Sequence, residues 1–247
     1  MTLPGSFFDT PDLSERLDAP EQMDDFSRAP AELDEALRDL RGVNRWLGGF
    51  RSVRQALRPL ARRRSYLRVL DLGAGSCDVP ARLVEWADAR CDTLLQVVAV
   101  DANPTVVRQA RRYLDERLHP RLRPQVLVEE GDALDLRFDD GDFDAATASL
   151  FLHHFADDAA RLLCEMDRVV TSGLIVSDLH RHPWAYTGIR AVAKLLPVSP
   201  MFTNDAPLSV RRGFTREELD RLARAAGLNG YVLRWRWAFR WVLSTVD

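Results

Sequence analysis

The sequence predicts an α/β fold in which helices cover both faces of a mostly parallel β-sheet. Short apolar runs alternate with helical patterns from about residue 65 to residue 177, and this alternation is typical of βαβ units. The runs are apolar at successive positions, as strands buried on both faces must be. The last segment, 230–246, is rich in β-branched and aromatic residues, which indicates two short antiparallel strands at the sheet edge.

The individual elements follow from the apolar periodicity and from the residues that interrupt it. Strands are expected at 67–72, 94–100, 125–129, 143–149 and 174–177. Helices are expected between them at 79–89, 105–118 and 157–170. After the fifth strand we expect an inserted helix at 182–196, a loop at 197–213, and a helix that begins with the capping box at Thr215 and stops at Gly227.

The residues before the first strand form a separate region. Residues 1–30 are rich in proline and acidic side chains, which predicts an irregular, loosely docked tail. A helix is expected from residue 31 to about residue 40, and a second one with a basic face follows Gly48 and Gly49. The chain is therefore expected to divide into residues 1–64 and a sheet-containing domain at 65–247, with an insertion at about 180–214.

Composition narrows the class of protein. The chain has 247 residues, of which 46% are hydrophobic and 29% charged, and its net charge is -3, so no broad basic surface for a nucleic-acid backbone is expected. The three cysteines form no metal or disulfide pattern, which favours reduced thiols. No signal-peptide pattern and no apolar run of about 18 residues are found, so we expect a cytoplasmic protein without a membrane span.

A glycine turn joins the first strand to the next helix. Glycines at 73 and 75 let a ligand approach the backbone closely, and the following helix adds partial positive charge. Such a turn is a weak signal by itself, because dinucleotide-binding folds use it too. Two acids narrow the interpretation: Asp71 precedes the turn, and Asp101 ends the next strand, where it can accept hydrogen bonds from ribose hydroxyls.

Four successive segments, at 69–75, 100–104, 131–133 and 143–150, resemble the motifs of class I (Rossmann-like) S-adenosylmethionine-dependent methyltransferases. The resemblance covers about residues 65–175 and implies that fold, with S-adenosyl-L-methionine as cofactor. It also implies that the glycine turn holds the methionine part of the cofactor, the acid of the second strand its ribose, and the 131–133 turn its adenine. The cofactor-binding residues implied by position are Asp71, Gly73, Ala74, Gly75, Asp101, Ala102, Asp132, Ala133 and Ser149.

Two further features bear on the cofactor. Cys77 stands where the family often has a third glycine, and its side chain either crowds the cofactor or tightens the helix start. Residues 43–49, followed by Arg54, loosely resemble the segment before the first motif in ubiquinone and menaquinone biosynthesis methyltransferases. That resemblance implies that Asn44 and the glycine pair line the cofactor pocket and that residues 31–60 form a lid. The alternative is a plain helix–helix turn with a glycine C-cap.

Four histidines follow the fourth and fifth strands, where an open parallel sheet meets its substrate. The sulfonium is already a good methyl donor, so the enzyme must mainly align an acceptor and keep it deprotonated. A histidine general base can do this. We favour His180 over His154 and His153, because it lies two residues after Asp178, which can orient it. The alternatives are a wall or hydrogen-bonding role for the first pair and a loop-fixing role for His180 and His182.

A metal site built from Asp178, His180 and His182 is a disfavoured alternative, because the cofactor itself supplies the reactive carbon. Residues 177–183 and 207–214 resemble bacterial methyltransferases of aromatic or polyketide-like acceptors. The resemblance makes His182, Trp184 and Arg211 candidate substrate-binding residues. The helix at 184–196 either roofs a flat acceptor or packs on the sheet. Arg211 and its neighbour Arg212 either receive a carboxylate or form a solvated pair.

The function expected from these residues is methyl transfer to a small aromatic or polyketide-like acceptor, by preference at a hydroxyl oxygen. A nucleic-acid or protein methyltransferase is the first alternative, but it calls for a basic, aromatic-bearing face or a different motif after the fourth strand. A non-catalytic methyltransferase-like binding protein is the second, and the intact acids and glycines disfavour it. A nicotinamide-dependent oxidoreductase is the third.

Overall fold

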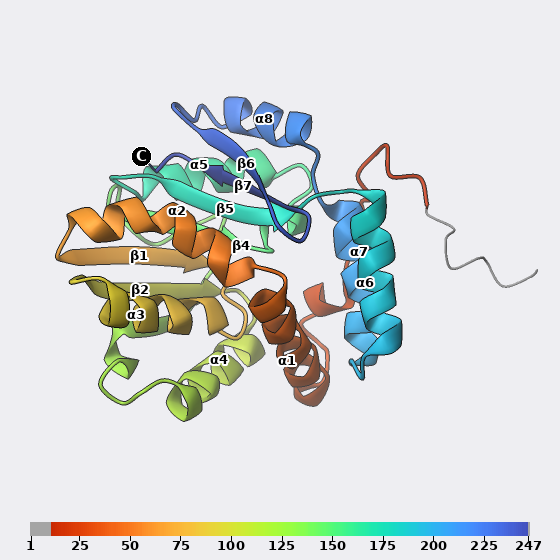
Figure 1. Ribbon diagram of the computed structural model, residues 1–247, viewed down its shortest axis with the longest axis horizontal. Helices are drawn as coiled ribbons and strands as arrows, with labels where there is room; N and C mark the ends of the chain where they lie inside the picture. The colour runs from red at the N-terminus through yellow and green to blue at the C-terminus, as the bar shows by residue number, and fades with distance from the viewer. Residues whose placement is uncertain (1–10, 247) are drawn as a thin grey trace, which may run out of the picture.

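The computed structural model describes residues 11–246 and contains one seven-stranded sheet, in the order β3-β2-β1-β4-β5-β7-β6 (Figure 1). Its strands are β1 Tyr66–Leu72, β2 Leu94–Asp101, β3 Val126–Glu130, β4 Ala145–Ser149, β5 Leu174–Leu179, β6 Val232–Arg236 and β7 Arg240–Ser244. Strands β1 to β5 pair in parallel, and β7 runs antiparallel to both of its neighbours. The predicted fold class is confirmed.

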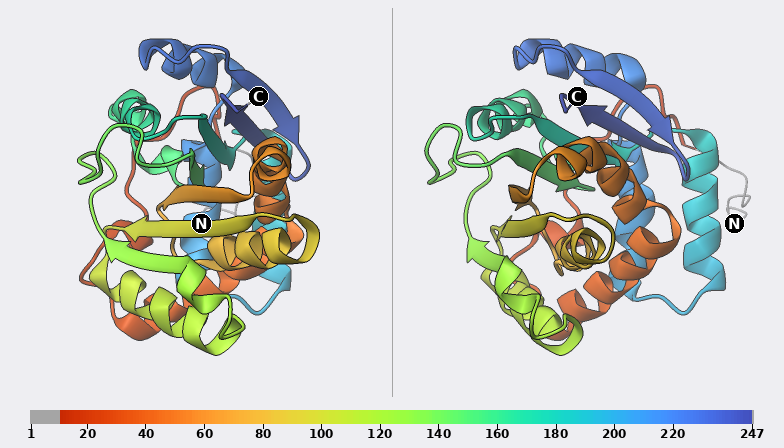
Figure 2. Two further views of the ribbon diagram at one scale, coloured as in Figure 1. Left: turned by 90° about the vertical axis from the view of Figure 1, so that its left-hand side faces the viewer. Right: turned by 60° about the vertical axis from the view of Figure 1, so that its left-hand side comes forward.

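Successive residues of a strand point to opposite faces of the sheet, and here the residues on both faces are apolar. Helices therefore cover both faces. Val69 and Val97 belong to the core under α2 Gly49–Arg63, α3 Asp78–Arg90 and α4 Pro104–Arg117. Leu70 and Val98 belong to the core under α5 Ala159–Arg168 and α8 Arg216–Ala225. In the left view of Figure 2, α2 and α3 lie on one side of the sheet and α5 on the other.

The predicted loop at 197–213 is wrong, because the structure has a helix there, α7 Pro200–Arg212. The side chain of Ser199 accepts a hydrogen bond from the amide of Phe202 at the start of this helix, and Pro200 occupies its first turn, where proline is well tolerated. Pro207 suggested a loop because it lacks an amide donor, but it is accommodated within the helix. Helix α7 packs against α6 Pro183–Leu195 and against α1 Pro30–Trp46 (Figure 1).

Residues 11–28, which we call the N-terminal strap, are well docked, so the prediction of a loose tail is wrong for them. The guanidinium of Arg181 donates to the carbonyls of Leu13 and Ser14, at 2.9 and 3.2 Å, and pairs with both carboxylate oxygens of Glu218, at 2.6 and 2.8 Å. A buried arginine thus satisfies backbone carbonyls that an irregular segment leaves without partners. Residues 1–10 of the predicted tail lie outside the described part of the chain.

Further along the strap, the short helix η1 Gln22–Asp24 is fixed by α7. The carboxylate of Asp205 is buried and accepts from the amides of Gln22 and Met23, each at 3.0 Å. This contact fixes the position of Glu21 and Asp24, the acidic residues that flank and end η1. Within the described residues, no helix is both long and apolar enough to cross a membrane.

Arg181→Ala should lower the free energy of unfolding by about 3 kcal/mol or more, because it leaves a largely buried carboxylate and two strap carbonyls without their donor. Urea denaturation measures the change. Arg121→Ala is the control, since the ion pair of Arg121 with Asp88 is at the surface and should contribute little. Equal effects of the two substitutions would contradict the role of Arg181 as anchor of the strap.

Candidate functional site

A cavity of about 600 Å³ lies at the carboxyl ends of the parallel strands, between the sheet, α1, α6, α7 and the N-terminal strap. All ten residues expected to bind cofactor line it: Asn44, Asp71, Gly73, Ala74, Gly75, Asp101, Ala102, Asp132, Ala133 and Ser149. His153, His154 and Trp184 also line it, whereas Asp178, His180, His182 and Arg211 do not. The site is therefore assembled where the parallel sheet predicts, and of the four catalytic candidates it is lined by His153 and His154 and not by His180 or Asp178.

The glycine turn after β1 is required by its backbone and by its neighbour. Gly73 and Gly75 have φ values of 61° and 51°, in the left-handed region. A Cβ atom on Gly73 would lie 2.0 Å from the ring of Phe151, so no side chain fits there. The amide of Gly75 donates to Asp101, at 3.0 Å, and this bond ties the turn to the end of β2.

Cys77 occupies the same left-handed region, with a φ of 57°, which explains why a glycine is favourable at this position. Its side chain is fully buried in the core below α3 and does not line the cavity. The two possibilities left open by the sequence are thereby decided: Cys77 belongs to the start of the helix and does not crowd the site.

Three carboxylates, those of the buried Asp71 and Asp78 and of the partly buried Asp101, lie at the sheet side of the cavity. Burial, and then the neighbouring charges of Asp78 and Asp101, raise the pKa of Asp71 to about 7, against the opposing effect of the Thr147 hydroxyl that donates to it. Burial likewise raises the pKa of Asp78 and of Asp101. Carboxylates whose ionisation is made costly by burial favour a ligand that carries positive charge.

Unpartnered polar atoms point to the same conclusion. Asn44 Oδ1, Asp78 Oδ2 and Ser149 Oγ are buried and have no hydrogen-bond partner among the described residues, although all three residues line the cavity. Buried polar atoms without partners are costly, so a hydrogen-bonding ligand would relieve them. S-adenosylmethionine carries a sulfonium, an ammonium and two ribose hydroxyls, and this chemistry fits the carboxylates and the free oxygen atoms.

The turn between α1 and α2 holds Asn44 against the carboxylates. The Asn44 amide donates to Asp78 Oδ1, at 3.3 Å. Gly48 is left-handed, with a φ of 82°, and a Cβ on Gly49 would lie 2.4 Å from Asn44 Oδ1. The glycine pair therefore serves both as a helix–helix turn and as the support of a cavity residue. Of the segment 31–60, α1 lines the cavity, whereas α2 covers the sheet; movement of α1 as a lid stays a prediction.

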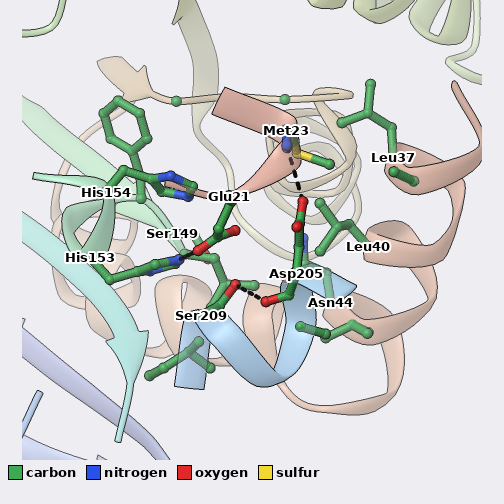
Figure 3. A pocket seen from close by; sticks show the side chains of 18 of the residues that line it. Glu21, Met23, Leu37, Leu40, Asn44, Ser149, His153, His154, Asp205 and Ser209 are labelled. Atoms are coloured by element: carbon green, nitrogen blue, oxygen red, sulfur yellow. Dashed lines mark hydrogen bonds and ion pairs between the residues drawn. The ribbon is translucent and has the colours of Figure 1, made fainter. Parts of the chain in front are cut away.

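His153 is the histidine that Asp178 orients. Its Nδ1 lies 2.7 Å from Asp178 Oδ1, and its Nε2 lies 3.5 Å from Glu21 Oε1 (Figure 3). Burial alone would lower the pKa of His153, but attraction to Asp178 and hydrogen bonds to Asp178 and Glu21 outweigh it and raise the pKa to about 9. The sequence predicts that Asp178 orients a histidine. In the structure that histidine is His153, with Asp178 on β5 and His153 on η3 Leu152–His154.

His154 lies beside His153, with ring centroids 4.4 Å apart, and its Nδ1 is 2.7 Å from Asp24 Oδ1. The buried Arg212 completes the cluster, because its guanidinium contacts Glu21 at 3.4 Å and Asp24 at 2.9 Å. The same guanidinium donates to the carbonyls of both histidines, at 3.2 and 3.0 Å. The interpretation of Arg212 as part of a solvated pair is therefore wrong, while its neighbour Arg211 lies outside the cavity lining.

The structure does not bring His180 to the cavity. Strand β5 ends at Leu179, and the amide of His180 donates to the carbonyl of Phe239, which turns the residue toward the β6–β7 hairpin. There His180 Nδ1 accepts from the indole of Trp235, at 3.3 Å. Burial, followed by the nearby His182 and Arg181, lowers the pKa of His180 to about 4. Its surroundings are those of a packed aromatic cluster.

His182 likewise serves the backbone. Its Nδ1 accepts from the amide of Trp184, at 3.2 Å, and so caps α6, while its ring stacks on Phe239. This arrangement matches the loop-fixing alternative for the second histidine pair.

Sequence reasoning missed several cavity residues: Glu21, Asp24, Asp78, Phe151, Asp205 and Arg240. A signal existed for Asp78, an acid in the first turn of the helix that follows the glycine motif. No local pattern marks Glu21 or Asp24, which lie in a segment of irregular composition.

Asp71→Asn should stabilise the ligand-free protein more at pH 8 than at pH 4. Because the pKa of Asp71 rises from 3.8 to about 7 on folding, the native state binds more protons than the unfolded state in that window, so wild-type stability falls as pH rises through it. The Asn variant lacks this loss, which amounts to roughly 4 kcal/mol at most, at about 1.36 kcal/mol per pKa unit. Urea denaturation from pH 4 to 8 measures it, and a pH-independent difference would contradict it.

Gly49→Ala should displace Asn44 and weaken binding of S-adenosylhomocysteine, the product form of the expected cofactor, at least several-fold by calorimetry. The matched control is Gly42→Ala in α1, where a Cβ meets nothing within 4 Å. That substitution should leave binding unchanged and stabilise the helix by about 0.5–1 kcal/mol. Equal affinities in both variants would argue against a role for Asn44 in the site.

Comparison with known proteins gives a consistent result. Residues 70–178 match a family model described as a methyltransferase domain. The chain is 32% identical to a demethylmenaquinone methyltransferase of Roseiflexus sp. (strain RS-1) over 200 residues, which are 76% of this chain and 79% of the relative. It is 34% identical over 127 residues to a protein of the same name from Deinococcus radiodurans, a match that covers 51% of this chain and 48% of the relative.

Solved structures show the same fold. A SAM-dependent methyltransferase from Aquifex aeolicus superposes with a TM-score of 0.59 at 14% identity, over 88% of this chain and 98% of its own. Human N-acetylserotonin methyltransferase, solved in complex with SAM, gives a TM-score of 0.61 at 18% identity, over 88% of this chain and 56% of its own. Together with the sequence relatives, these findings identify the chain as a member of the S-adenosylmethionine-dependent methyltransferase family that contains the demethylmenaquinone methyltransferases, with S-adenosylmethionine as its methyl donor.

Proposed function

We propose that this methyltransferase acts on a hydroxylated aromatic small molecule, bound in the part of the cavity between α6, α7 and the N-terminal strap. The proposal rests on the difference in polarity between two parts of one cavity. The carboxylates of Asp71, Asp78 and Asp101 lie on the sheet side, whereas the part between α6, α7 and the strap has many apolar side chains: Met23, Phe26, Ile189, Val192, Met201 and Phe202. Pockets for flat organic ligands combine such walls with a few polar groups.

Glu21, His153 and His154 are among the polar groups of the second part, and their side chains gather at one place in the cavity (Figure 3). We assign the two histidines to the acceptor's hydroxyl group, whose ionised oxygen needs fixed hydrogen-bond donors, and Glu21 to holding the ring of His153 in place. Ionisation of a hydroxyl activates both its oxygen and the neighbouring ring carbon. The sequence favours the oxygen, whereas a relative named as a ubiquinone/menaquinone biosynthesis C-methyltransferase, beside those named demethylmenaquinone methyltransferases, favours a ring carbon. Product analysis decides between the two.

The sheet side of the cavity is proposed to hold the cofactor, which supplies the methyl group as an electrophile on a sulfonium. Asp101 already accepts from the amides of Gly75 and Asn103, each at 3.0 Å, and its remaining lone pairs are available to ribose hydroxyls. The free oxygen atoms of Asn44 and Asp78 suit the ammonium group. Asp132 and Ala133, in the turn after β3, are placed for the adenine.

A direct test is turnover with S-adenosylmethionine and a panel of naphthohydroquinones, resorcinols and simple phenols, with mass spectrometry of the products. His153→Gln should lower kcat/KM about 10²–10³-fold, because it removes a group that meets the developing charge, and should change the affinity for S-adenosylhomocysteine little. Asp101→Asn should instead have its main effect on the affinity for S-adenosylhomocysteine, which should fall.

The control for this test is His180→Gln, which changes a histidine outside the cavity lining and should retain nearly wild-type turnover. An inactive His180 variant beside an active His153 variant would reverse the assignment. No turnover on any hydroxylated aromatic, with S-adenosylmethionine bound, would overturn the proposed acceptor class.

A further inference from the structure

The cluster on the acceptor side has the composition of a metal site. One ring nitrogen of His153, one of His154 and one carboxylate oxygen of Glu21 lie within 4.8 Å of one another. Glu21 and His153 are buried, with 6% and 2% of their surface exposed. Figure 3 shows the Glu21 carboxylate lying between the two imidazole rings. Two histidines and one carboxylate are a common ligand set for divalent transition metals, and they leave coordination positions open.

A second observation concerns the other nitrogen of each ring. Nδ1 of His153 lies 2.7 Å from Asp178, and Nδ1 of His154 lies 2.7 Å from Asp24. A hydrogen bond from Nδ1 to a carboxylate fixes the ring and leaves the lone pair of Nε2 free for a metal, an arrangement found in most histidine metal sites. Here both histidines have such a partner, and the two partners come from different segments of the chain.

Charge supports the same conclusion. The side chains in direct ionic contact within the cluster are the carboxylates of Glu21, Asp24 and Asp178 and one cation, Arg212. A metal ion would take the place of the proton that His153 holds, and without that proton these groups leave an excess of negative charge. Buried charge without compensation is costly, and a divalent cation at the centre of the cluster would compensate it.

We propose that Glu21, His153 and His154 bind one divalent transition-metal ion, with Asp24 and Asp178 as the partners that orient the histidines. The open coordination positions face the cavity and take the oxygen of the acceptor's hydroxyl group, a part of the proposal that rests on the proposed function. The hydroxyl loses its proton to solvent, and a coordinate bond forms between the oxygen and the metal, with no change in oxidation state. The metal also ties the N-terminal strap to the sheet, because Glu21 and Asp24 both belong to the strap.

The experiment uses the full chain after dialysis against a chelator. Zn²⁺ and Co²⁺ are titrated by calorimetry and equilibrium dialysis, with Mg²⁺ as a hard cation for comparison. One equivalent of Zn²⁺ or Co²⁺ should bind per chain, much more tightly than Mg²⁺, and should raise the Tm. Glu21→Gln and His154→Gln should each weaken binding 100-fold or more, and Asp24→Asn about 10–100-fold. His180→Gln, in the other histidine pair, is the matched control and should bind as the wild type does.

His154 is partly exposed, so its variant keeps the test valid if Glu21→Gln does not fold. Absence of stoichiometric binding, or wild-type affinity in both His154→Gln and Glu21→Gln, would overturn the metal site. Full methyl transfer to a hydroxylated aromatic by the chelator-treated protein would overturn the role of the metal and leave the proposed function intact. Stoichiometric binding that is lost in the variants, without turnover on any hydroxylated aromatic, would support the metal site and overturn the proposed function.

Discussion

The parallel alignment of β1 with its neighbours β2 and β4 is the constraint on which the rest of the site depends. Asp71 is paired in register with Ala99 on one side and Thr147 on the other, so the three strands reach the same edge together. The carboxylates of the proposed cofactor side lie at that edge. Asp178, which orients His153, lies there too, on the next strand, β5. If neighbouring strands ran in opposite directions, their carboxyl ends would lie at opposite edges of the sheet. These groups would then be separated by the length of a strand.

The meeting of the expected cofactor residues in one cavity was predictable, because these residues are neighbours in the sequence or lie at strand ends. A glycine turn and an acid at the end of the next strand are local patterns, and a parallel sheet then determines where they meet. The proposed acceptor side is built from contacts between remote segments, such as that of Arg212 with Glu21, 191 residues apart. No periodicity or motif encodes such a pairing, which only the packing of α7 against the strap creates.

The incorrect predictions have equally specific causes. Pro207 suggested a loop, but the capped start at Ser199 and the apolar contacts of Met201 and Phe202 outweigh the loss of one amide donor. His180 was favoured on the assumption that strand geometry continued past Leu179, whereas the carbonyl of Phe239 accepts its amide and redirects it. In both cases a tertiary contact overrides a local tendency.

The attachment of the strap also has a consequence for the order of folding. Its anchors, Arg181, Asp205 and Arg212, are all synthesised long after the strap itself, which is the first described segment to leave the ribosome. Until they appear, the strap lacks the arginines that bind its carbonyls and carboxylates and the aspartate that fixes η1, and closing so long a loop is slow. The wall beside the acceptor is therefore expected to be the last part of the molecule to form, after the sheet and the cofactor side have already folded.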